Sequence, residues 1–463
     1  MAGCIRYRPV TPPNSGPRAV ADYAARTLSD PALQSYIVGV LGLAADTGWT
    51  EDRVALTALY FRGDLALSRA AVDEARADEM TAGAWPPFSA QGDVSRTARP
   101  LENTGSRWSE TISATVTLEL GGKRGARIAA ARAATLGARL RLDAAAWQLA
   151  NDARAATAGA VAADSDLADA VAAAGAVQAL TGLLRARYAE GQVPLAEIAR
   201  AESDARAAAV DAVEAERVRT DARVALARAV GVVVDRVDTL QLRLTPTSSC
   251  SAFDALAAHG GDAAERDSLA GAALQSRPDV GAELAEYAVA DAGVRLEVAR
   301  QYPDLTLGPG LLWDQGIPGW IVSVGLPALI GGRNRGPIAG AEARRAQAAA
   351  RVRIVQDSVL GAVDAAVARC RGVRRIVATA DSLVAATEYA VTVADSAFQR
   401  GETGRTELAI ARLALVRAIH TRHLAQSYRV DAGAALDRAT GRWIGLTAHG
   451  PWPGPAAGAD LPH

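Results

Sequence analysis

The side chains that could support metal binding or covalent chemistry are few and scattered along the chain. His420 and His423 are three residues apart, which places both imidazoles on one face of a helix, where they could bind a metal ion. The sequence offers no third ligand beside them, so we favour an exposed pair over a metal site. The cysteines, Cys4, Cys250 and Cys370, are too few and too dispersed for a disulfide framework or a cysteine-based zinc site. We expect Cys370, among alanines and arginines, to be a small packing residue.

Two glycine-rich runs, GGKRG at 121–125 and GGRNRG at 331–336, raise the question of phosphate binding. Both lack the Lys-Ser/Thr pair that completes a phosphate-binding loop, so we interpret them as connections between a strand and a helix. Serines occur without a matching histidine and acid. We therefore predict no enzyme, and no catalytic, cofactor-binding or metal-binding residues.

The composition predicts a mainly helical chain with a small β part. Hydrophobic residues make up 50% of the 463 residues but aromatic residues only 5%, and alanine dominates the apolar part. An alanine-rich core cannot fill a thick globular interior, but it lets helices pack closely side by side. The net charge of -1 excludes a strongly basic nucleic-acid surface, so we expect no nucleic-acid partner. The sequence contains no run of eighteen apolar residues, so it predicts no transmembrane helix. Strands would therefore have to cross any membrane.

The chain contains an internal duplication. GGKRGARI at 121–128 corresponds to GGRNRGPI at 331–338, and YAEGQVPLAEI at 188–198 corresponds to FQRGETGRTEL at 398–408, both with an offset of 210 residues. Further matches in the same order are ARAVG with DRATG, ending at Gly231 and Gly441, and the weaker RGDL at 62–65 with RPDV at 277–280. Because the matches keep their order, we interpret the chain as two copies of one unit.

The duplication defines the expected domain organisation. Each repeat should contain a helix, two strands, a long helical stretch, a glycine-bearing break and another helix. The expected segments are an N-terminal tether at 1–45, a first repeat at 46–244, a connection at 245–262, a second repeat at 263–441 and a flexible tail at 442–463.

Strands are predicted from alternation with a period of two residues. The clearest example, TISATVTLEL at 111–120, alternates without a break for ten residues, the length of a membrane-spanning strand. The predicted strands are at about 86–97, 110–120, 303–314 and 319–328. A soluble hairpin on a core would explain the same alternation, but two isolated hairpins would still need a partner sheet. A barrel closed from several chains supplies one.

One face of these strands is expected to contact membrane lipid if the sheet spans a membrane. Trp313 and Trp320 bracket the expected turn DQGIPG, where interfacial aromatic residues would lie. The candidate membrane-strand residues are Ile112, Val116, Leu118, Trp313, Trp320, Val322 and Val324.

The helices after the strands are predicted to be long. No proline and few glycines occur between Arg124 and Tyr188, which corresponds to about 100 Å of helix, and the stretch from Ala339 to Gln399 is similar. Thin alanine and valine seams do not bury enough area for a lone rod to be stable, so the sequence predicts neighbouring chains.

The N-terminus contains the tripeptide Ala2-Gly3-Cys4 followed by a proline-rich segment. It is similar to the end of a bacterial lipoprotein signal, in which the cysteine becomes the acylated first residue. We hypothesise that the start lies upstream of Met1 and that Cys4 carries lipid. The alternative is an accidental Gly-Cys pair.

The order of these parts resembles the TolC-type outer-membrane efflux factors. The resemblance covers about residues 50–441, and it depends on an ordered set of motifs that occurs twice. These motifs are RPDV at 277–280, QYPDLTL at 301–307, LPALIGGRNRGPI at 326–338 with LELGGKRGARI at 118–128, and RYAEGQVPLAEI at 187–198 with FQRGETGRTEL at 398–408.

The resemblance implies a homotrimer in the outer membrane that extends into the periplasm. Long antiparallel helical hairpins would form a periplasmic α-barrel, and four strands per chain would form a twelve-stranded β-barrel. The breaks at Gly191 and Gly401 would be the periplasmic tips that contact an adaptor (membrane fusion) protein. Acidic residues after the second tip line the closed entrance in the family, and Glu407 matches one such position, but Ile410 stands where a second acid is usual. The alternative for Glu407 is a solvated acid in the first turn of a helix.

The predicted function is a passive exit duct of a tripartite export system, coupled to an inner-membrane pump through the periplasmic adaptor. Selection would come from the pore and the gate, without a cofactor. The alternative is a soluble coiled-coil scaffold without transport activity. The transported substrate, whether drug, metal ion or polypeptide, and the identity of the pump cannot be predicted from the residues.

Overall fold

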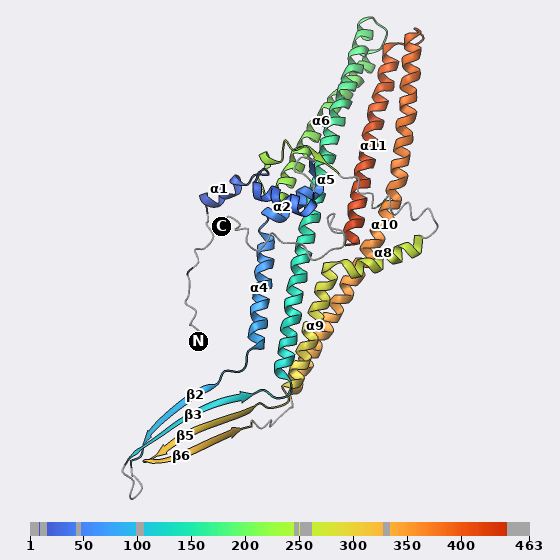
Figure 1. Cartoon of the computed structure of the whole chain (residues 1–463). Coiled ribbons are helices and arrows are strands. Elements are labelled where there is room, and N and C mark those ends of the chain that lie inside the picture. Colours follow the sequence, from blue (N-terminus) through green and yellow to red (C-terminus); the bar gives the residue numbers. More distant parts are fainter. Residues whose placement is uncertain are drawn as a thin grey trace. The chain divides into compact units, whose positions relative to one another are not determined.

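The computed structural model describes most of both repeats (Figure 1). The described residues are 9, 16–42, 48–98, 106–244, 250, 262–326 and 334–441. The lipidation candidate Cys4, the tail 442–463 and all of the connection 245–262 except Cys250 and residue 262 lie outside these ranges. The predicted fold class, mainly helical with four long strands, is confirmed.

The elements follow the same order in the two repeats. The N-terminal half contains α1 (Pro17–Ala25), α2 (Pro31–Leu41), β1 (Trp49–Thr50), α3 (Glu51–Phe61), α4 (Asp64–Gly83), β2 (Ser89–Arg96), β3 (Trp108–Leu118), α5 (Lys123–Ala189), α6 (Leu195–Val230), η1 (Val234–Arg236) and β4 (Leu242–Arg243). The C-terminal half contains α8 (Asp262–Ser276), α9 (Pro278–Ala299), β5 (Leu305–Asp314), β6 (Ile317–Gly325), α10 (Arg335–Gln399) and α11 (Arg405–Ala439).

The chain forms two compact units, and each draws on both repeats. The first unit contains the described parts of 1–65, 145–277 and 359–463, and the second contains 66–144 and 278–358. The long helices α5 and α10, of 67 and 65 residues, each contribute to both units. A helix of this length measures about 100 Å, as the sequence predicts.

The second unit contains a four-stranded antiparallel sheet in the order β2-β3-β5-β6 (Figure 1). The hairpin between β5 and β6 turns through Gln315 and Gly316, both with positive φ. Such a two-residue turn suits the right-handed twist of the strands. It is shorter than the expected DQGIPG turn, because Pro318 pairs with Trp313 within the sheet. Proline is tolerated there because β6 is an edge strand.

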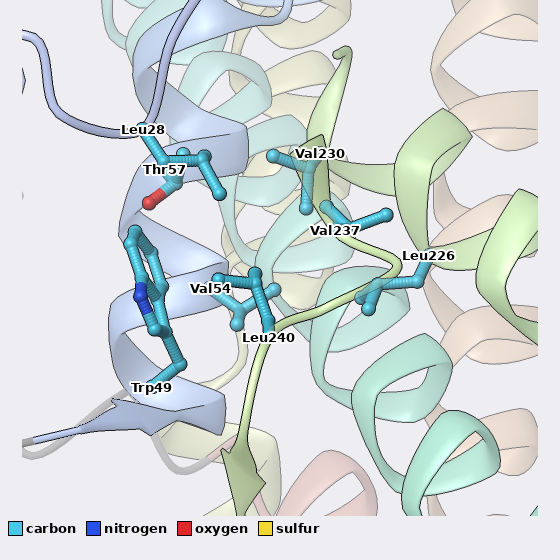
Figure 2. Close-up of a pocket in the computed structure, with 8 residues that line it drawn as sticks. All are labelled: Leu28, Trp49, Val54, Thr57, Leu226, Val230, Val237 and Leu240. Carbon is cyan, nitrogen blue, oxygen red and sulfur yellow. The ribbon is translucent and has the colours of Figure 1, made fainter. Parts of the chain in front are cut away.

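The first unit has an apolar core where α2, α3 and α6 meet. Leu33 and Leu56 are fully buried, and Leu226 of α6 is buried with them. An apolar pocket opens beside this core (Figure 2). Its lining residues are Leu28, Trp49, Val54, Thr57, Leu226, Val230, Val237 and Leu240. A short parallel pairing of β1 with β4 lies in the same unit and pairs Trp49 with Leu242.

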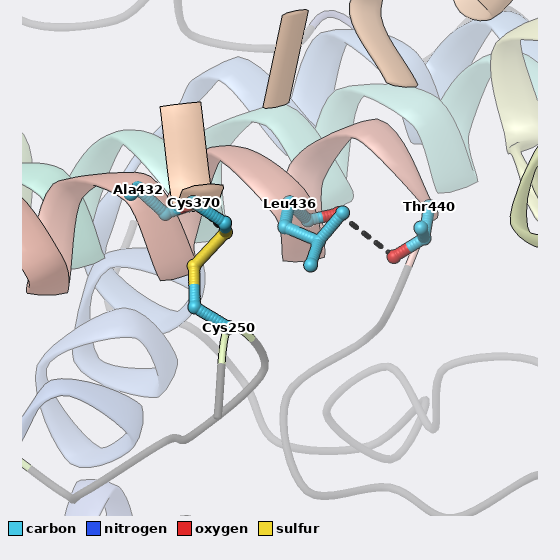
Figure 3. The surroundings of a disulfide bond; sticks show 5 residues. All are labelled: Cys250, Cys370, Ala432, Leu436 and Thr440. Atoms are coloured by element: carbon cyan, nitrogen blue, oxygen red, sulfur yellow. Dashed lines mark hydrogen bonds between the residues drawn. A yellow bond between two sulfur atoms is a disulfide. The ribbon is translucent and has the colours of Figure 1, made fainter. Parts of the chain in front are cut away.

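The sequence predicts that Cys370 is a small packing residue, and this prediction is wrong. It forms a disulfide with Cys250, whose Cα lies 5.5 Å away (Figure 3). The two cysteines are 120 residues apart in the sequence, but the fold brings their Cα atoms within the range that a disulfide requires. The connection between the repeats is therefore bonded covalently to α10.

Within the described ranges, α5 and α10 each contain an 18-residue window apolar enough to cross a membrane by length and composition. This finding differs from the expectation of no such helix, because alanine and valine raise the mean hydropathy of a window that polar residues interrupt. It is weak evidence for a span, since core helices of soluble proteins meet the same criterion. Only 22% and 11% of these windows are buried, so the single chain leaves much of their apolar surface uncovered.

Candidate functional site

The register of the four-stranded sheet places all seven predicted membrane-strand residues on one face. Ile112 pairs with Leu311, which pairs with Trp320, and Val116 is linked to Val324 in the same way through β5. Most of these side chains are exposed in the single chain. The exposed fractions are 62% for Ile112, 42% for Val116, 37% for Leu118, 42% for Trp313, 86% for Trp320, 73% for Val322 and 64% for Val324. A contiguous apolar surface of this kind requires an apolar environment to cover it.

The opposite face of the sheet is mostly polar with small side chains, although Leu312, Ile317 and Ile321 also lie on it. On β3 it consists of serines and threonines: Ser109, Thr111, Ser113, Thr115 and Thr117. Here Ser323 Oγ donates to the carbonyl oxygen of Gly308 (3.0 Å), and Thr306 Oγ1 donates to that of Gly325 (3.1 Å). A Cβ on Gly308 or Gly325 would collide with these hydroxyl groups. The two faces of the sheet therefore differ in polarity.

The sheet has two strand edges without a neighbour among the described residues. β2 pairs only with β3, and β6 pairs only with β5. Free edges present unpaired backbone N–H and C=O groups, which a membrane interior cannot hydrogen-bond. The sheet can therefore be stable in a membrane only if another strand covers each edge.

Ion pairs fix the passage from the sheet into α5. Lys123 Nζ lies 2.7 Å from Asp304 Oδ1, and the backbone N–H of Leu120 donates to the same oxygen (3.2 Å). Arg127 donates to both carboxylate oxygens of Glu119 at 2.6 and 3.2 Å, and this contact raises the pKa of the guanidinium. The lysine of the GGKRG run is thus engaged in an ion pair at the start of the helix, as expected of a structural connection.

The turns between the paired long helices have the same backbone. Gly191 and Gly401 have φ values of 71° and 73°, which only glycine adopts without strain. At the first turn Gly191 N donates to the carbonyl of Tyr188 (2.8 Å) and Gln192 N to that of Arg187 (2.9 Å). The second turn repeats both bonds, from Gly401 to Phe398 and from Glu402 to Ala397, each at 2.9 Å. This is the Schellman arrangement, and it ends both helices 210 residues apart.

Glu407 lies in the first turn of α11 and is exposed. Its Oε2 would lie 2.8 Å from a Cβ built on Gly404, so the carboxylate folds back over the N-cap residue of its own helix. A carboxylate in this position is favoured by the helix dipole and by the unpaired N–H groups. Glu197 occupies the equivalent position of α6, but its N-cap residue is Pro194, which has no N–H to offer.

The two histidines are not an exposed isolated pair. His423 Nδ1 lies 2.8 Å from Asp169 Oδ2, and His420 Nδ1 lies 3.4 Å from the same oxygen and 3.6 Å from Asp166 Oδ1. Among the described residues no group of histidine, cysteine and carboxylate side chains has the arrangement of a metal site. Sequence reasoning missed the two aspartates, although their own spacing of three residues in a helix places them on one face.

Comparison with known proteins agrees with this arrangement. The family model for outer membrane efflux proteins matches residues 57–232 and 269–442. No curated protein sequence matches the chain.

Solved structures share the fold at low sequence identity. The outer membrane protein VceC of Vibrio cholerae is 21% identical with a TM-score of 0.66, covering 84% of this chain and 96% of VceC. The CmeC outer membrane channel of Campylobacter jejuni is 16% identical with a TM-score of 0.63, covering 84% and 85%. The open-state MtrE outer membrane channel of Neisseria gonorrhoeae is 19% identical with a TM-score of 0.62, covering 84% and 88%. With a family model that matches both repeats and a fold shared with outer-membrane channels, the chain belongs to the outer membrane efflux protein family.

Proposed function

We propose that three copies of this chain close into one duct through the outer membrane. Family membership makes the chain an outer-membrane efflux channel, and this excludes the alternative function of a soluble coiled-coil scaffold. The trimer rests on one observation above all, the four-stranded sheet with an exposed apolar face and two edges that no described strand covers. Three such sheets joined edge to edge give twelve strands, a number that closes a barrel wide enough for a lumen.

In this duct each face of the sheet has a separate role. The apolar face with Trp320 and Val322 contacts lipid, and the opposite face, which carries the serines and threonines of β3, lines the lumen. Below the membrane, α5, α6, α10 and α11 form the periplasmic tunnel, whose uncovered apolar surface packs against the neighbouring chains. The turns at Gly191 and Gly401 contact the periplasmic adaptor, which joins the duct to an inner-membrane pump.

The duct itself is passive, and the pump supplies the energy. The family consists of export channels rather than enzymes, so the chain selects by the width and charge of its lumen and entrance. Cys4, in the lipoprotein-like tripeptide Ala2-Gly3-Cys4, adds an acyl anchor. Mass spectrometry of protein extracted from the outer membrane tests this anchor, and an unmodified Cys4 would contradict it.

The assignment of the two faces is tested with a matched pair of substitutions on β3. Ile112→Arg places a cation on the lipid face, which destabilises a barrel by about 2 to 4 kcal/mol near the middle of the membrane. Thr111→Arg places the same cation one residue away, on the lumen face. We expect I112R to reduce the amount of protein in outer membranes, and T111R to insert normally and to shift the ion selectivity of single channels in planar bilayers toward anions. Equal loss of insertion in both variants would contradict the assignment.

A further inference from the structure

Two exposed aromatic side chains and one arginine lie where the four-stranded sheet of the second unit meets the helices. Trp85 and Phe88 are 70% and 73% exposed and belong to the segment WPPF between α4 and β2. Arg124 lies in the first turn of α5, and its guanidinium carbon is 4.6 Å from the centre of the Trp85 ring. Aromatic rings this exposed require an apolar or interfacial environment to cover them.

The two aromatic side chains continue the apolar face of the sheet. Ala90 pairs with Ala114 on that face, and Phe88 comes two residues before Ala90. The two prolines of WPPF favour a polyproline II conformation with three residues per turn, which places Trp85 on the same side as Phe88. Lipid that covers the apolar face would therefore also reach these two rings.

The length of the strands places the group at one edge of the membrane. β3 has 11 residues, so its ends are about 33 Å apart along the strand, or about 24 Å across a membrane at a tilt of about 45°. This is close to the height of the apolar band of outer-membrane barrels. Trp108 and Trp313 lie at the far end of the sheet, and Trp85 and Phe88 lie at the end joined to the helices. Because the helices extend into the periplasm, this end faces the periplasmic leaflet.

Arg124 is the cation of this group and has no acidic partner among the described residues. Its basic neighbours on α5 each face a carboxylate: Lys123 and Asp304 (2.7 Å), Arg127 and Glu119 (2.6 Å), and Arg132 and Glu79 (3.4 Å). The nearby acids are thus occupied by other cations. Since the helix dipole disfavours a cation in the first turn, Arg124 calls for an anion from outside the chain.

The guanidinium of Arg124 is fixed in place with donors to spare. Its Nε and Nη2 donate to the carbonyl oxygen of Gly83 at 3.2 and 2.6 Å. The contact with the ring of Trp85 holds the guanidinium at the level of the indole. A guanidinium has five N–H groups, so three remain for a ligand, in the planar fork that suits a phosphate group.

The second repeat replaces this cation by a neutral amide. At the offset of 210 residues Arg124 corresponds to Asn334. Asn334 Nδ2 donates to the carbonyl oxygen of Glu297 (2.7 Å) and to its Oε2 (3.0 Å), so both of its N–H groups are engaged. The duplicated unit therefore needs no arginine here to connect a strand with a helix, and the free donors of Arg124 belong to the first repeat.

We propose that Arg124, Trp85 and Phe88 bind a phospholipid of the periplasmic leaflet. Arg124 donates to the phosphate oxygens, the ring of Trp85 lies at the level of the headgroup, and Phe88 contacts the acyl chains. The inference rests on the proposed lipid face of the sheet. It adds a specific contact with the phosphate, which an apolar face alone does not provide.

The test is native mass spectrometry of the purified full-length protein in detergent, titrated with phosphatidylglycerol or with diacylglycerol. The two lipids have the same acyl chains, but diacylglycerol has no phosphate. We expect Arg124→Gln to weaken the binding of phosphatidylglycerol about tenfold, because charge-assisted hydrogen bonds are lost, and to leave the binding of diacylglycerol unchanged. Arg132→Gln is the matched control, since it removes one cation from the same helix at a side chain that is 71% exposed. It should bind both lipids as the wild type does.

Four outcomes would overturn the proposal. Equal weakening by R124Q and R132Q would show that only the general positive charge of α5 matters. Equal affinity of the wild type for the two lipids would show that no phosphate is recognised. Competition by inorganic phosphate as strong as by phosphatidylglycerol would assign the site to free phosphate. A Trp85→Leu variant that lowers the fraction of trimer without changing lipid affinity would show that a neighbouring chain covers the rings.

The same spectra separate this site from the proposed duct. The mass of the lipid-free protein reports the number of chains, so a failure of the trimer is seen independently of lipid binding. A trimer that shows no preference for the phosphate-bearing lipid contradicts the lipid site alone.

If R124Q does not fold, photo-cross-linking of the wild type replaces it. The protein is reconstituted with phosphatidylethanolamine that carries a photoreactive group on its headgroup, and the labelled peptides are identified by mass spectrometry. Labels should occur on the peptides that contain Trp85 and Phe88 or the first turns of α5. Labels confined to other peptides would overturn the proposal.

Discussion

The two repeats have the same order of elements but are fastened by different side chains. In the first repeat, Arg223 of α6 is 4% exposed, donates to the carbonyl oxygens of Val237 (2.7 Å) and Leu240 (3.2 Å), and pairs with Asp164 of α5. One buried guanidinium thus joins both helices of the hairpin to the segment that follows them.

In the second repeat a disulfide takes this role. Cys370 of α10, bonded to Cys250, lies 3.7 Å from the carbonyl oxygen of Ala432 on α11 (Figure 3). Neither fastening has a counterpart in the other repeat. At the offset of 210 residues Cys370 corresponds to Ala160, and Arg223 corresponds to Gly433.

Unlike these side-chain contacts, the turns between the paired long helices are shared by the two repeats. Gly191 and Gly401 and the two backbone bonds at each turn are the same in both repeats. A left-handed residue at the end of a helix can only be replaced at a cost, whereas many side-chain combinations can hold two helices together. The backbone requirements of the duplicated unit therefore persist in both copies, and its side-chain fastenings differ.

The largest effect should come from the fastening of the first repeat. Arg223→Met leaves the carbonyls of Val237 and Leu240 without their donor and removes a cation from Asp164. We expect a loss of about 3 to 5 kcal/mol in the free energy of unfolding, measured by denaturant titration. Arg217→Met on the same helix is the control, since Arg217 is exposed and should change nothing measurable. Equal losses in both variants would show that Arg223 is not the fastening.

The fastening of the second repeat should contribute somewhat less. Cys370→Ser removes a bond that joins residues 120 positions apart, and we expect a loss of about 2 to 4 kcal/mol. A reducing agent should lower the wild-type unfolding midpoint to that of the variant and leave the variant unchanged. If the reducing agent has no effect on the wild type, the disulfide does not contribute to stability.

Two aspartates of the second unit should respond to pH in opposite directions. Burial raises the pKa of Asp143 on α5, and Arg345, together with Arg295, lowers the pKa of Asp291 on α9. Asp143 therefore costs stability above its unfolded pKa, a cost relieved as pH falls through its raised folded pKa. Asp291 contributes stability above its unfolded pKa, and this contribution is lost as pH falls through its lowered folded pKa.

We expect Asp143→Asn to raise the unfolding midpoint at pH 7 and Asp291→Asn to lower it. Both differences should become smaller as the solution is acidified toward pH 3. Thermal unfolding of the two variants and the wild type across this range is the measurement. Shifts of the same sign at pH 7 would contradict the account of their surroundings.

The smallest effect concerns the acids after the two helix turns. Glu407 can reach back to Gly404, whereas Glu197 follows a proline that has no N–H. We expect Glu407→Ala to destabilise by about 0.5 kcal/mol and Glu197→Ala by less. If E407A instead leaves stability unchanged and alters the single-channel cation preference while E197A does not, Glu407 acts at the entrance rather than as a helix cap.

Much of the fold could be predicted from local sequence patterns. The ten-residue alternation at 111–120, the proline-free stretch after Arg124 and the glycines at 191 and 401 each specify structure through neighbouring residues. The repeat offset then places the same elements in the second half. Membership of the efflux family followed from the order of these motifs.

The contacts between distant elements could not be predicted. No spacing in the sequence indicates that Cys370 meets Cys250, or that His423 meets Asp169 on the other repeat. Both contacts depend on how the long helices pack, and alanine-rich seams allow several alignments with similar burial. His420 and His423 could therefore be singled out from the sequence, but their aspartate partners could be identified only from the structure.

The central claim is that the free edges of the sheet meet between chains, and cysteine cross-linking in isolated outer membranes tests it directly. Within one chain Gln91 on β2 and Ile321 on β6 are separated by β3 and β5, about 14 Å, too far for a disulfide. We would combine Gln91→Cys with a cysteine at Gly319, Ile321 or Ser323, because the register between chains is not fixed by one sheet. The account predicts that at least one pair oxidises to dimers and trimers on a non-reducing gel, with no larger species. Monomers alone for all three pairs, or a ladder extending beyond trimers, would contradict the closed three-chain barrel.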